Sequence, residues 1–414
     1  MSVPSVLHPF AAPSREAGDY LEIVRAEGCR LWDAEGRSYL DGTASLWYCA
    51  VGHGRVEIID AVAAQMREVE AFHTFGRFTN GPEQRLADEL AQLAPIAGAR
   101  VLFTNSGSEA IDSALKLIRA GHRIAGEGGR TIFLTRESAY HGVMVGGTSL
   151  GGLPANRASF GPLLPDAYQV QRDSLQAMRD AVAYHGADRI AAVLAEPVIG
   201  AGGVFPPPDG YLQGLRDLCD ESGALLVFDE VITAFGRLGS WFGSHHYGVA
   251  PDLMTFAKAV TSGYLPLGGV VVGSSLRERL ESEDAFTLAH GGTYAGHPTC
   301  CAAGLANLAI MRREDLPARA GEAGRRLRAG LERLRDHPGV TGVRGEGLMQ
   351  AIALEPEVHA AVLTETMLAR GVIGRALPYA NAVAFSPPLV ISDGEVDELT
   401  DAMDAALDEL AAVR

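Results

Sequence analysis

The sequence predicts an α/β protein. A large domain with a mostly parallel β-sheet and helices on both faces is followed by a smaller α+β domain. Two observations support this prediction. Segments with helical spacing alternate with short apolar runs that end in turn residues. Beyond about residue 312 this alternation stops, and long charged helical segments surround two strand-like stretches. The chain has 414 residues and is 47% hydrophobic, which is sufficient for two packed regions.

The expected elements of the large domain follow one another along the chain. Two segments near its start have the apolar spacing of helices, 58–69 and 82–93. Short apolar runs typical of buried strands lie at 101–104, 131–135, 191–196, 225–229, 253–257 and 269–273. Helices such as 107–120 and 209–222 fall between these runs. Helices between buried strands favour a parallel sheet, because parallel strands need crossover connections.

The C-terminal part has a different order of elements. A long charged helix is expected at 315–336, two strands near 340–354, and further helices at 357–370 and 394–412. We interpret residues 51–311 as the large domain and residues 312–414 as the small one. The N-terminal segment, residues 1–50, is expected to join the small domain and to flank the large sheet.

Composition and charge argue against several kinds of partner and site. The net charge of −16 disfavours nucleic acid or an anionic membrane as a partner, and no apolar run reaches the roughly 18 residues of a membrane helix. The five cysteines form no CxxC pair and no signal-peptide pattern is present, so we expect a cytoplasmic protein with reduced thiols. His245-His246 has no suitably spaced carboxylate or cysteine, so no metal site is expected.

Ligands of such a sheet bind beyond the carboxyl ends of its strands, so the strand ends are the first places to search. One strand ends in FTNSGSEA, residues 103–110, and enters a helix there. Backbone amides at a helix N-terminus bind phosphate well. The alternative is an ordinary N-cap, in which Ser106 or Ser108 satisfies free amides. Because the chain has neither GxxxxGK[ST] nor GxGxxG after a strand, the phosphate need not belong to a nucleotide.

Two further strand ends carry charged residues. LLVFDEVIT, residues 225–233, delivers Asp229 and Glu230 from a buried run, and LMTFAKAV, residues 253–260, places Lys258 among apolar residues. Burial lowers the pKa of a lysine, and the neutral amine is the form that attacks a carbonyl. The alternative for a lone lysine is that its ammonium reaches the surface. A phosphate cradle, a buried carboxylate and an apolar lysine are together the anchors that pyridoxal phosphate needs.

Six motifs in this order resemble those of the class III aminotransferases: SGSEA (106–110), YHG (140–142), EPVIGAGG (196–203), FDEVITAFGR (228–237), TFAKAVTSGYLPLGG (255–269) and GTYAGHP (292–298). The similarity covers nearly the whole chain, from LWDAEGRSYLDG near residue 31 to SPPLVIS near residue 386. The resemblance implies the aspartate aminotransferase fold (fold type I), with a mostly parallel sheet of the seven-stranded type. It also implies pyridoxal 5'-phosphate at the subunit boundary of a homodimer, or of a tetramer built from dimers.

The resemblance assigns roles to the residues at matching positions. Lys258 would hold the cofactor as an aldimine and act as the catalytic base. Asp229 would contact the pyridine nitrogen, and a carboxylate there keeps the ring protonated and so an electron sink. Gly107 and Ser108 would bind the phosphate through backbone amides and a hydroxyl.

The resemblance also assigns the residues around the ring. Tyr140 matches the aromatic residue on one face and Val231 the aliphatic residue on the other; simple core packing is the alternative for both. Thr293 matches the residue that reaches the phosphate from the neighbouring subunit. His141 and Glu230 would hold neighbouring side chains in place rather than take part in the chemistry.

The substrate pocket rests on fewer matches. Relatives that act on ornithine or γ-aminobutyrate carry a glutamate at the position of Ala201, whereas EPVIGAGG is similar to the ω-amino acid:pyruvate group. Leu46-Trp47-Tyr48 resembles the aromatic wall of that group, with a hydrophobic strand as the alternative. Arg375, in GVIGRAL, matches an arginine that binds a substrate carboxylate, although the loop before SPPL is about two residues longer than usual. A surface arginine is the alternative.

These matches predict an aminotransferase that moves an amino group from an ω-amino acid or amine to a keto acid. Pyruvate is the expected acceptor and the mechanism is expected to be ping-pong. A decarboxylating transaminase, an aminomutase or a racemase of the same fold would show the same motifs. A binding module without activity is disfavoured, because Lys258, Asp229 and the phosphate turn are all present.

Overall fold

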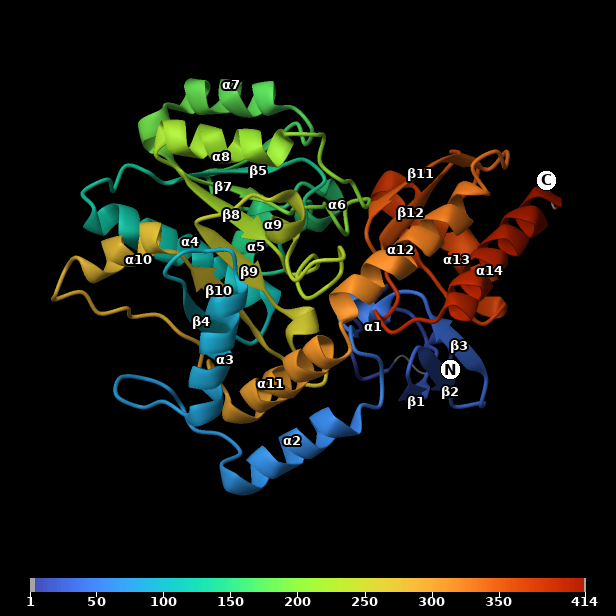
Figure 1. Cartoon of the computed structure of the whole chain (residues 1–414). Coiled ribbons are helices and arrows are strands. Elements are labelled where there is room, and N and C mark those ends of the chain that lie inside the picture. The colour runs from blue at the N-terminus through green and yellow to red at the C-terminus, as the bar shows by residue number, and fades with distance from the viewer. Residues whose placement is uncertain (1–3, 413–414) are drawn as a thin grey trace.

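The computed structural model describes residues 4–412, and its largest sheet has seven strands in the order β4-β10-β9-β8-β7-β5-β6 (Figure 1). The neighbouring strands from β9 to β6 are parallel, and β10 is antiparallel to both β4 and β9. The predicted α/β class with a mostly parallel sheet is therefore confirmed. The strands are β4 (Arg100–Thr104), β5 (Ile132–Arg136), β6 (Ala167–Val170), β7 (Ile190–Ala195), β8 (Leu225–Asp229), β9 (Leu253–Phe256) and β10 (Gly268–Val272).

The predicted apolar runs coincide with all of these strands except β6. Every residue of β5, β7 and β8 is buried, as strands covered on both faces require. β6 lies at the edge of the sheet, and only its last residue, Val170, is buried. A short edge strand with one buried side chain lacks the apolar run that reveals a central strand, so the sequence did not predict it.

Helices cover both faces of this sheet (Figure 1). α4 (Gly107–Ile124) packs on one face, and α7 (Leu175–His185) and α8 (Tyr211–Ser222) pack on the other. In β8, Leu225 and Val227 join the apolar cluster of α4, whereas Leu226 and Phe228 join the cluster of α7 and α8. Successive side chains of a strand point to opposite faces, so the four apolar residues of β8 contribute to two layers.

The C-terminal part forms a four-stranded antiparallel sheet in the order β11-β12-β15-β14. α12 and α13 pack on this sheet, and α14 packs on both helices. The helix predicted at 315–336 ends at Glu332, where a turn over residues 333–337 replaces it. The elements are α12 (Leu316–Glu332), β11 (Val340–Glu346), β12 (Met349–Leu354), α13 (Ala360–Ala369), β14 (Arg375–Leu377), β15 (Ala382–Phe385) and α14 (Asp393–Ala412).

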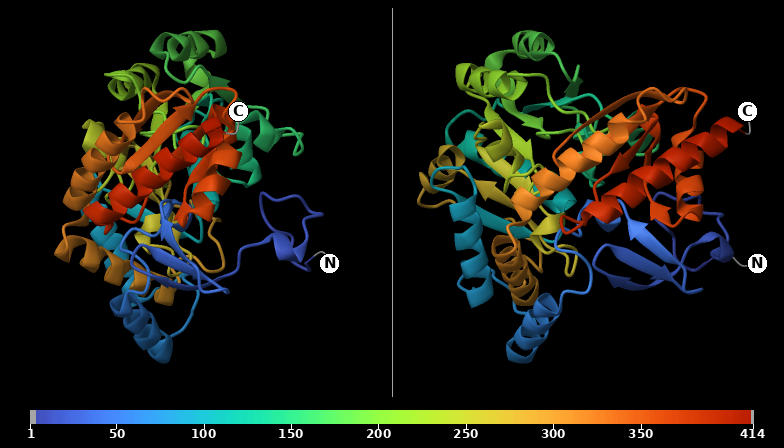
Figure 2. Two further views of the ribbon diagram at one scale, coloured as in Figure 1. Left: turned by 90° about the vertical axis from the view of Figure 1, so that its right-hand side faces the viewer. Right: turned by 45° about the vertical axis from the view of Figure 1, so that its right-hand side comes forward.

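The N-terminal segment builds a third sheet from β1 (Ile23–Glu27), β2 (Arg30–Asp33) and β3 (Ser38–Asp41). Its fourth strand, β13 (Val372–Ile373), comes from the C-terminal part and pairs in parallel with β3. The N-terminal strands therefore lie beside the C-terminal helices (Figure 2). This pairing agrees with the expectation that the segment joins the small domain, and the boundaries at residues 50 and 311 remain a prediction.

α11 (Pro298–Arg313) packs on α2 (Val56–Glu68) and α3 (Gly81–Leu93). The sequence predicted α2 and α3, but not α11, whose buried residues are not confined to one narrow stripe. The remaining α-helices are α1 (Ala44–Trp47), α5 (Val145–Leu150), α6 (Pro154–Arg157), α9 (Gly243–Tyr247) and α10 (Ser274–Glu281). Within residues 4–412, no helix combines the length and apolar character needed to cross a bilayer.

Candidate active site

A cavity of about 580 Å³ lies at the carboxyl ends of the parallel strands. Asp229 ends β8, Glu196 follows β7, Gly107 begins the helix after β4, and Lys258 follows β9. All four line the cavity, because the carboxyl ends of parallel strands meet at one edge of the sheet. Among the described residues, the cavity brings together eight of the nine predicted site residues: Trp47, Gly107, Ser108, Tyr140, Asp229, Val231, Lys258 and Arg375.

The turn between β4 and α4 leaves backbone amides free. Ser106 is the N-cap of α4, and its Oγ accepts a hydrogen bond from the Glu109 amide at 3.1 Å. The amides of Gly107 and Ser108 have no acceptor within residues 4–412. Ser108 Oγ accepts from the Val143 amide at 3.0 Å, so its own proton remains available. Ser106 is thus the ordinary N-cap, whereas the next two residues offer donors that suit a phosphate.

Two side chains provide walls for a flat ring. A Cβ on Gly107 would lie 2.9 Å from Cγ2 of Val231, so only glycine permits this close approach. Val231 is held at the end of β8, where its amide donates to Oδ1 of Asp229 at 3.1 Å. Tyr140 contributes an aromatic ring to the same cavity, and burial raises the pKa of its hydroxyl. The cavity therefore contains both the aliphatic and the aromatic side chain that the sequence predicted.

Asp229 is buried and held by a chain of hydrogen bonds. Its Oδ2 lies 2.8 Å from Nδ1 of His141, and its Oδ1 accepts from Oγ1 of Thr255 at 3.0 Å. Nε2 of His141 lies 3.0 Å from Oγ1 of Thr135. Because both ring nitrogens of His141 have partners, the orientation of the imidazole is fixed and with it the carboxylate. This geometry supports the predicted role of His141 as a residue that positions its neighbour.

Lys258 has an uncommon backbone conformation and an amine with no hydrogen-bond partner in residues 4–412. Its φ is 50°, in the left-handed region that few residues other than glycine adopt. Burial lowers its pKa from 10.5 to about 8; Asp229 and Glu196 oppose this effect, and Arg375 adds to it. About a tenth of the amine is therefore neutral near pH 7, and this neutral form is the one that attacks a carbonyl.

Glu196 is a buried site residue that the sequence analysis did not single out. Its Oε1 accepts from the Tyr140 amide at 3.0 Å and its Oε2 from the Gly200 amide at 2.9 Å. Burial raises its pKa; His141 opposes this effect and Asp229 reinforces it. The carboxyl group thus joins two loops that line the cavity. Its position directly after a predicted strand is a signal that would have identified it.

The outer part of the cavity is largely apolar. Trp47 is buried and lines it together with Leu46. The alternative of a hydrophobic strand at 46–48 is wrong, because α1 is a distorted turn with positive φ at Ala44, Ser45 and Trp47. Other lining residues that no sequence motif marked include Pro9, Phe10, Leu153, Ala155, Asn156 and Tyr379.

Arg375 begins β14 and contributes a guanidinium group to the cavity. It lines the cavity and is only partly exposed, so the alternative of a surface arginine is wrong. Its Nε is buried without a hydrogen-bond partner, and no carboxylate of residues 4–412 pairs with it. Burial lowers its pKa and Tyr140 opposes the effect. Free N–H groups of a guanidinium suit a ligand carboxylate.

Thr293 is the predicted residue that does not line this cavity. It is exposed, in the loop before α11. A residue that acts on the neighbouring subunit need not line the cavity of its own chain, so the role of Thr293 stays a prediction.

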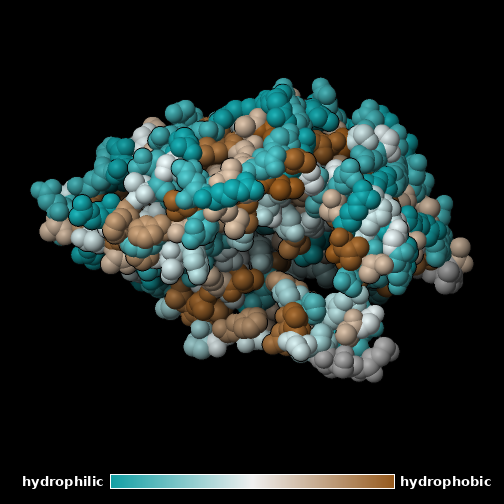
Figure 3. Space-filling view, turned by 90° about the horizontal axis from the view of Figure 1, so that it is seen from below, coloured by the Kyte–Doolittle hydropathy of each residue, from teal (hydrophilic) through white to brown (hydrophobic). Residues whose placement is uncertain are grey.

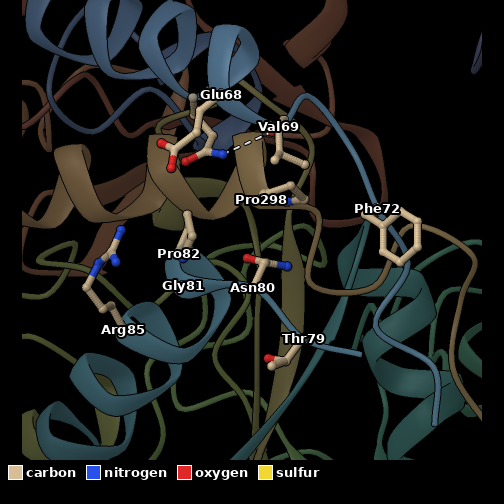
Figure 4. A pocket seen from close by; sticks show the side chains of 10 residues that line it. Glu68, Val69, Phe72, Thr79, Asn80, Gly81, Pro82, Arg85 and Pro298 are labelled. Atoms are coloured by element: carbon tan, nitrogen blue, oxygen red, sulfur yellow. Dashed lines mark hydrogen bonds between the residues drawn. The ribbon is translucent and has the colours of Figure 1, made fainter. Parts of the chain in front are cut away.

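A second hollow, of about 530 Å³, lies between the end of α2 and the start of α3 (Figure 4). Its lining includes Glu68 at the end of α2, Val69 and Phe72 after it, and Asn80 and Arg85 at the start of α3. None of the predicted site residues lines this hollow. Its lining residues belong to helices and loops rather than to the carboxyl ends of the sheet strands, so the hollow is not a candidate catalytic site.

Known proteins match nearly the whole of this chain. The family model described as aminotransferase class-III covers residues 12–407. The chain belongs to the class III aminotransferases. Members of this family depend on pyridoxal 5'-phosphate.

Two curated relatives and one solved structure illustrate the similarity of this class III aminotransferase. It is 37% identical to the β-alanine–pyruvate aminotransferase of Pseudomonas aeruginosa, over 97% of this chain and 95% of that protein. It is 36% identical to the putrescine–pyruvate aminotransferase of the same species, over 94% and 91%. An amine transaminase from an uncultivated Pseudomonas species, solved in its PLP-bound internal aldimine form, has a TM-score of 0.93 and 36% identity and covers 99% of both chains. Fold type I is thereby confirmed.

The residues of the cavity fit the cofactor of this family. The free amides of Gly107 and Ser108 suit its phosphate, and the carboxylate of Asp229 suits its ring nitrogen. Within residues 4–412, the amine of Lys258 has no hydrogen-bond partner that it would have to leave before it reacts with an aldehyde. The enzyme is thus a pyridoxal phosphate-dependent transaminase whose own geometry agrees with its family.

Proposed function

We propose that this aminotransferase transfers an amino group from an ω-amino acid or an amine to pyruvate by a ping-pong mechanism. The observation that carries the proposal is the unpaired Arg375 beside a largely apolar wall. Its guanidinium can bind the carboxylate of a small keto acid. Ala201 lines the same cavity and offers no carboxylate that would compete for Arg375. The two relatives named for pyruvate support this acceptor.

Each residue around the reacting carbon has a distinct task in this proposal. Nζ of Lys258, whose pKa burial lowers to about 8, removes the proton from the substrate carbon in its neutral form and later returns one. Asp229, held by His141, keeps a negative charge beside the ring nitrogen. Glu196 holds the backbone of Tyr140 in place. Pyridoxal phosphate, when bound, supplies the electron sink for the charge that proton removal leaves.

The cavity explains how one site serves two kinds of donor. Arg375 binds the carboxylate of an ω-amino acid or, in the second half-reaction, that of pyruvate. Phe10, Leu46 and Trp47 offer apolar surface to a donor without a carboxylate. Both substrates use the same space and therefore occupy it in turn, which is the ping-pong order.

We further propose that the active form is a homodimer, or a tetramer of such dimers, in which Thr293 reaches the partner's cofactor phosphate. One face of the molecule gathers apolar side chains near α2 (Figure 3). A patch of this kind favours contact with another protein surface. The exposed large apolar residues of α2 and of the segment after it are Val56, Ile59, Met66, Val69, Phe72, Phe75 and Phe78.

Spectra of the separate half-reactions test the proposed substrates. The purified enzyme should show a yellow imine band that β-alanine or putrescine shifts and that pyruvate restores. Restoration by 2-oxoglutarate but not by pyruvate would overturn the acceptor. Carbon dioxide release, or racemisation without any keto acid, would instead indicate a decarboxylating enzyme or a racemase of the same fold.

A further inference from the structure

Arg172 and Arg344, from separate parts of the fold, meet on the ring of Phe205. Arg172 follows β6 of the large sheet, and Arg344 lies in β11 of the C-terminal sheet. Their guanidinium carbons lie 3.8 Å and 4.5 Å from the centroid of the Phe205 ring. Phe205 is fixed by a two-way backbone pairing with Ile199, at 2.9 Å and 3.1 Å. One phenyl ring with a fixed backbone therefore contacts both cations.

The acidic residues of the chain do not balance this pair of charges. Arg172 pairs with Asp173, whose side chain is 38% exposed, at 2.8 Å. Arg344 pairs with no carboxylate of residues 4–412; its Nε donates to the Gly203 carbonyl at 2.7 Å, and its Nη2 is buried without a partner. Burial lowers the pKa of Arg344 to about 10, and the charge of Arg172 adds to the effect. The group therefore has both an unsatisfied donor and an unbalanced charge.

We propose that Arg172 and Arg344 form a binding site for a phosphate group at the edge of Phe205, separate from the cofactor phosphate. A phosphate presents oxygens in several directions and carries up to two negative charges. It can therefore accept hydrogen bonds from two guanidinium groups on different elements, whereas a carboxylate fits one such fork. The ligand is either free inorganic phosphate or the phosphate of a small metabolite.

The position of the site connects it with the catalytic cavity. Nη1 of Arg172 donates to Oγ of Ser138 at 3.4 Å, and Ser138 lies two residues before Tyr140. Arg344 holds the carbonyl of Gly203, two residues after Ala201. Tyr140 and Ala201 both line the cavity. A phosphate bound to both arginines would therefore link the loop that contains Ser138 and Tyr140 to the loop that contains Ala201 and Gly203.

Binding of inorganic phosphate to the holoenzyme tests this site. The cofactor then fills its own phosphate subsite, and an unchanged visible spectrum verifies that it stays bound. Calorimetry at constant ionic strength should detect saturable phosphate binding in the wild type. Arg344→Gln and Arg172→Gln should each raise the dissociation constant at least about tenfold, the scale of a lost charge-assisted hydrogen bond. Arg325→Gln is the matched control, because Arg325 is exposed on α12, whereas the two guanidinium groups on the Phe205 ring are those of Arg172 and Arg344.

Hydrogen exchange provides a second measurement that a purely structural pair would not change. Added phosphate should slow exchange in both segments 138–142 and 199–205 of the wild type, and in neither segment of Arg344→Gln. The same titration with glycerol phosphate distinguishes the two possible ligands. Tighter binding of glycerol phosphate would indicate a phosphorylated metabolite, and tighter binding of inorganic phosphate would indicate the free ion. The proposal is wrong if the wild-type holoenzyme shows no saturable binding, or if both arginine variants bind phosphate as tightly as Arg325→Gln. Should Arg344→Gln fail to fold, Arg172→Gln decides alone.

Discussion

The burial of Lys258 predicts how fast the apoenzyme captures its cofactor at each pH. A pKa of about 8 leaves about a tenth of the amine neutral at pH 7, whereas the ordinary value of 10.5 would leave about 0.03%. The rate of imine formation is proportional to the neutral fraction. On mixing apoenzyme with pyridoxal phosphate, the second-order rate constant should rise about tenfold from pH 6 to 7 and level off above about pH 9.

Two substitutions should move this pH curve in opposite directions. Arg375 lowers the pKa of Lys258 and Asp229 raises it. Arg375→Met should therefore shift the curve to higher pH and Asp229→Asn to lower pH, each by roughly half a pH unit, the scale of a partly screened charge pair. Arg325→Met removes the same charge from the exposed surface of α12 and serves as the control.

Absorbance of the imine in a stopped-flow instrument gives these curves directly. A wild-type rate that keeps rising up to pH 10 would refute the reasoning, because it would mean that Lys258 has the pKa of an exposed lysine. Equal shifts in Arg375→Met and Arg325→Met would show that net charge, rather than a nearby guanidinium, sets this pKa.

Four further outcomes are expected. Asp229→Asn should keep its cofactor but lower kcat at least about hundredfold, because a neutral amide does not stabilise a protonated ring. An unchanged kcat would mean that Asp229 has only a structural role. Lys258→Ala should remain folded by circular dichroism yet lose transamination by several orders of magnitude, and full turnover would contradict its assignment. Arg375→Ala should weaken the binding of pyruvate by about 2 kcal/mol and leave the half-reaction of a simple amine unchanged in single-turnover measurements. Equal losses for both substrates would mean that another residue binds the carboxylate. Mixed dimers of Lys258→Ala and Thr293→Ala subunits should exceed the activity of either parent; no gain would place Thr293 in its own chain's site.

The parts of the fold that the sequence predicted are those with a strong local pattern. The largely apolar runs of β5, β7 and β8 can be recognised without any knowledge of their partner strands. β6 is short and at an edge, and β13 has two residues that become a strand only because β3 lies beside them. Pairing between segments that are far apart in the sequence depends on tertiary packing, so no local sequence pattern predicts it.

The candidate site divides in the same way. Strand ends directed attention to Asp229 and Lys258, and the same rule would have included Glu196, which follows β7. Phe10 and Asn156 line the cavity as well, but each belongs to a segment with no motif and no strand end. Only the folded chain brings these segments to the cavity.

The sequence by itself determined the fold class, the family resemblance and the chemistry-bearing residues, because strand ends, a glycine turn and a lysine among apolar neighbours are local features. The tertiary structure alone decided which of those residues share a cavity and what electrostatic environment they meet there. The pKa of Lys258 is lowered, and Arg375 has no acidic partner within residues 4–412, because burial and charge separation are properties of the packed chain. The meeting of Arg172 and Arg344 on Phe205 likewise depends on two sheets being brought together.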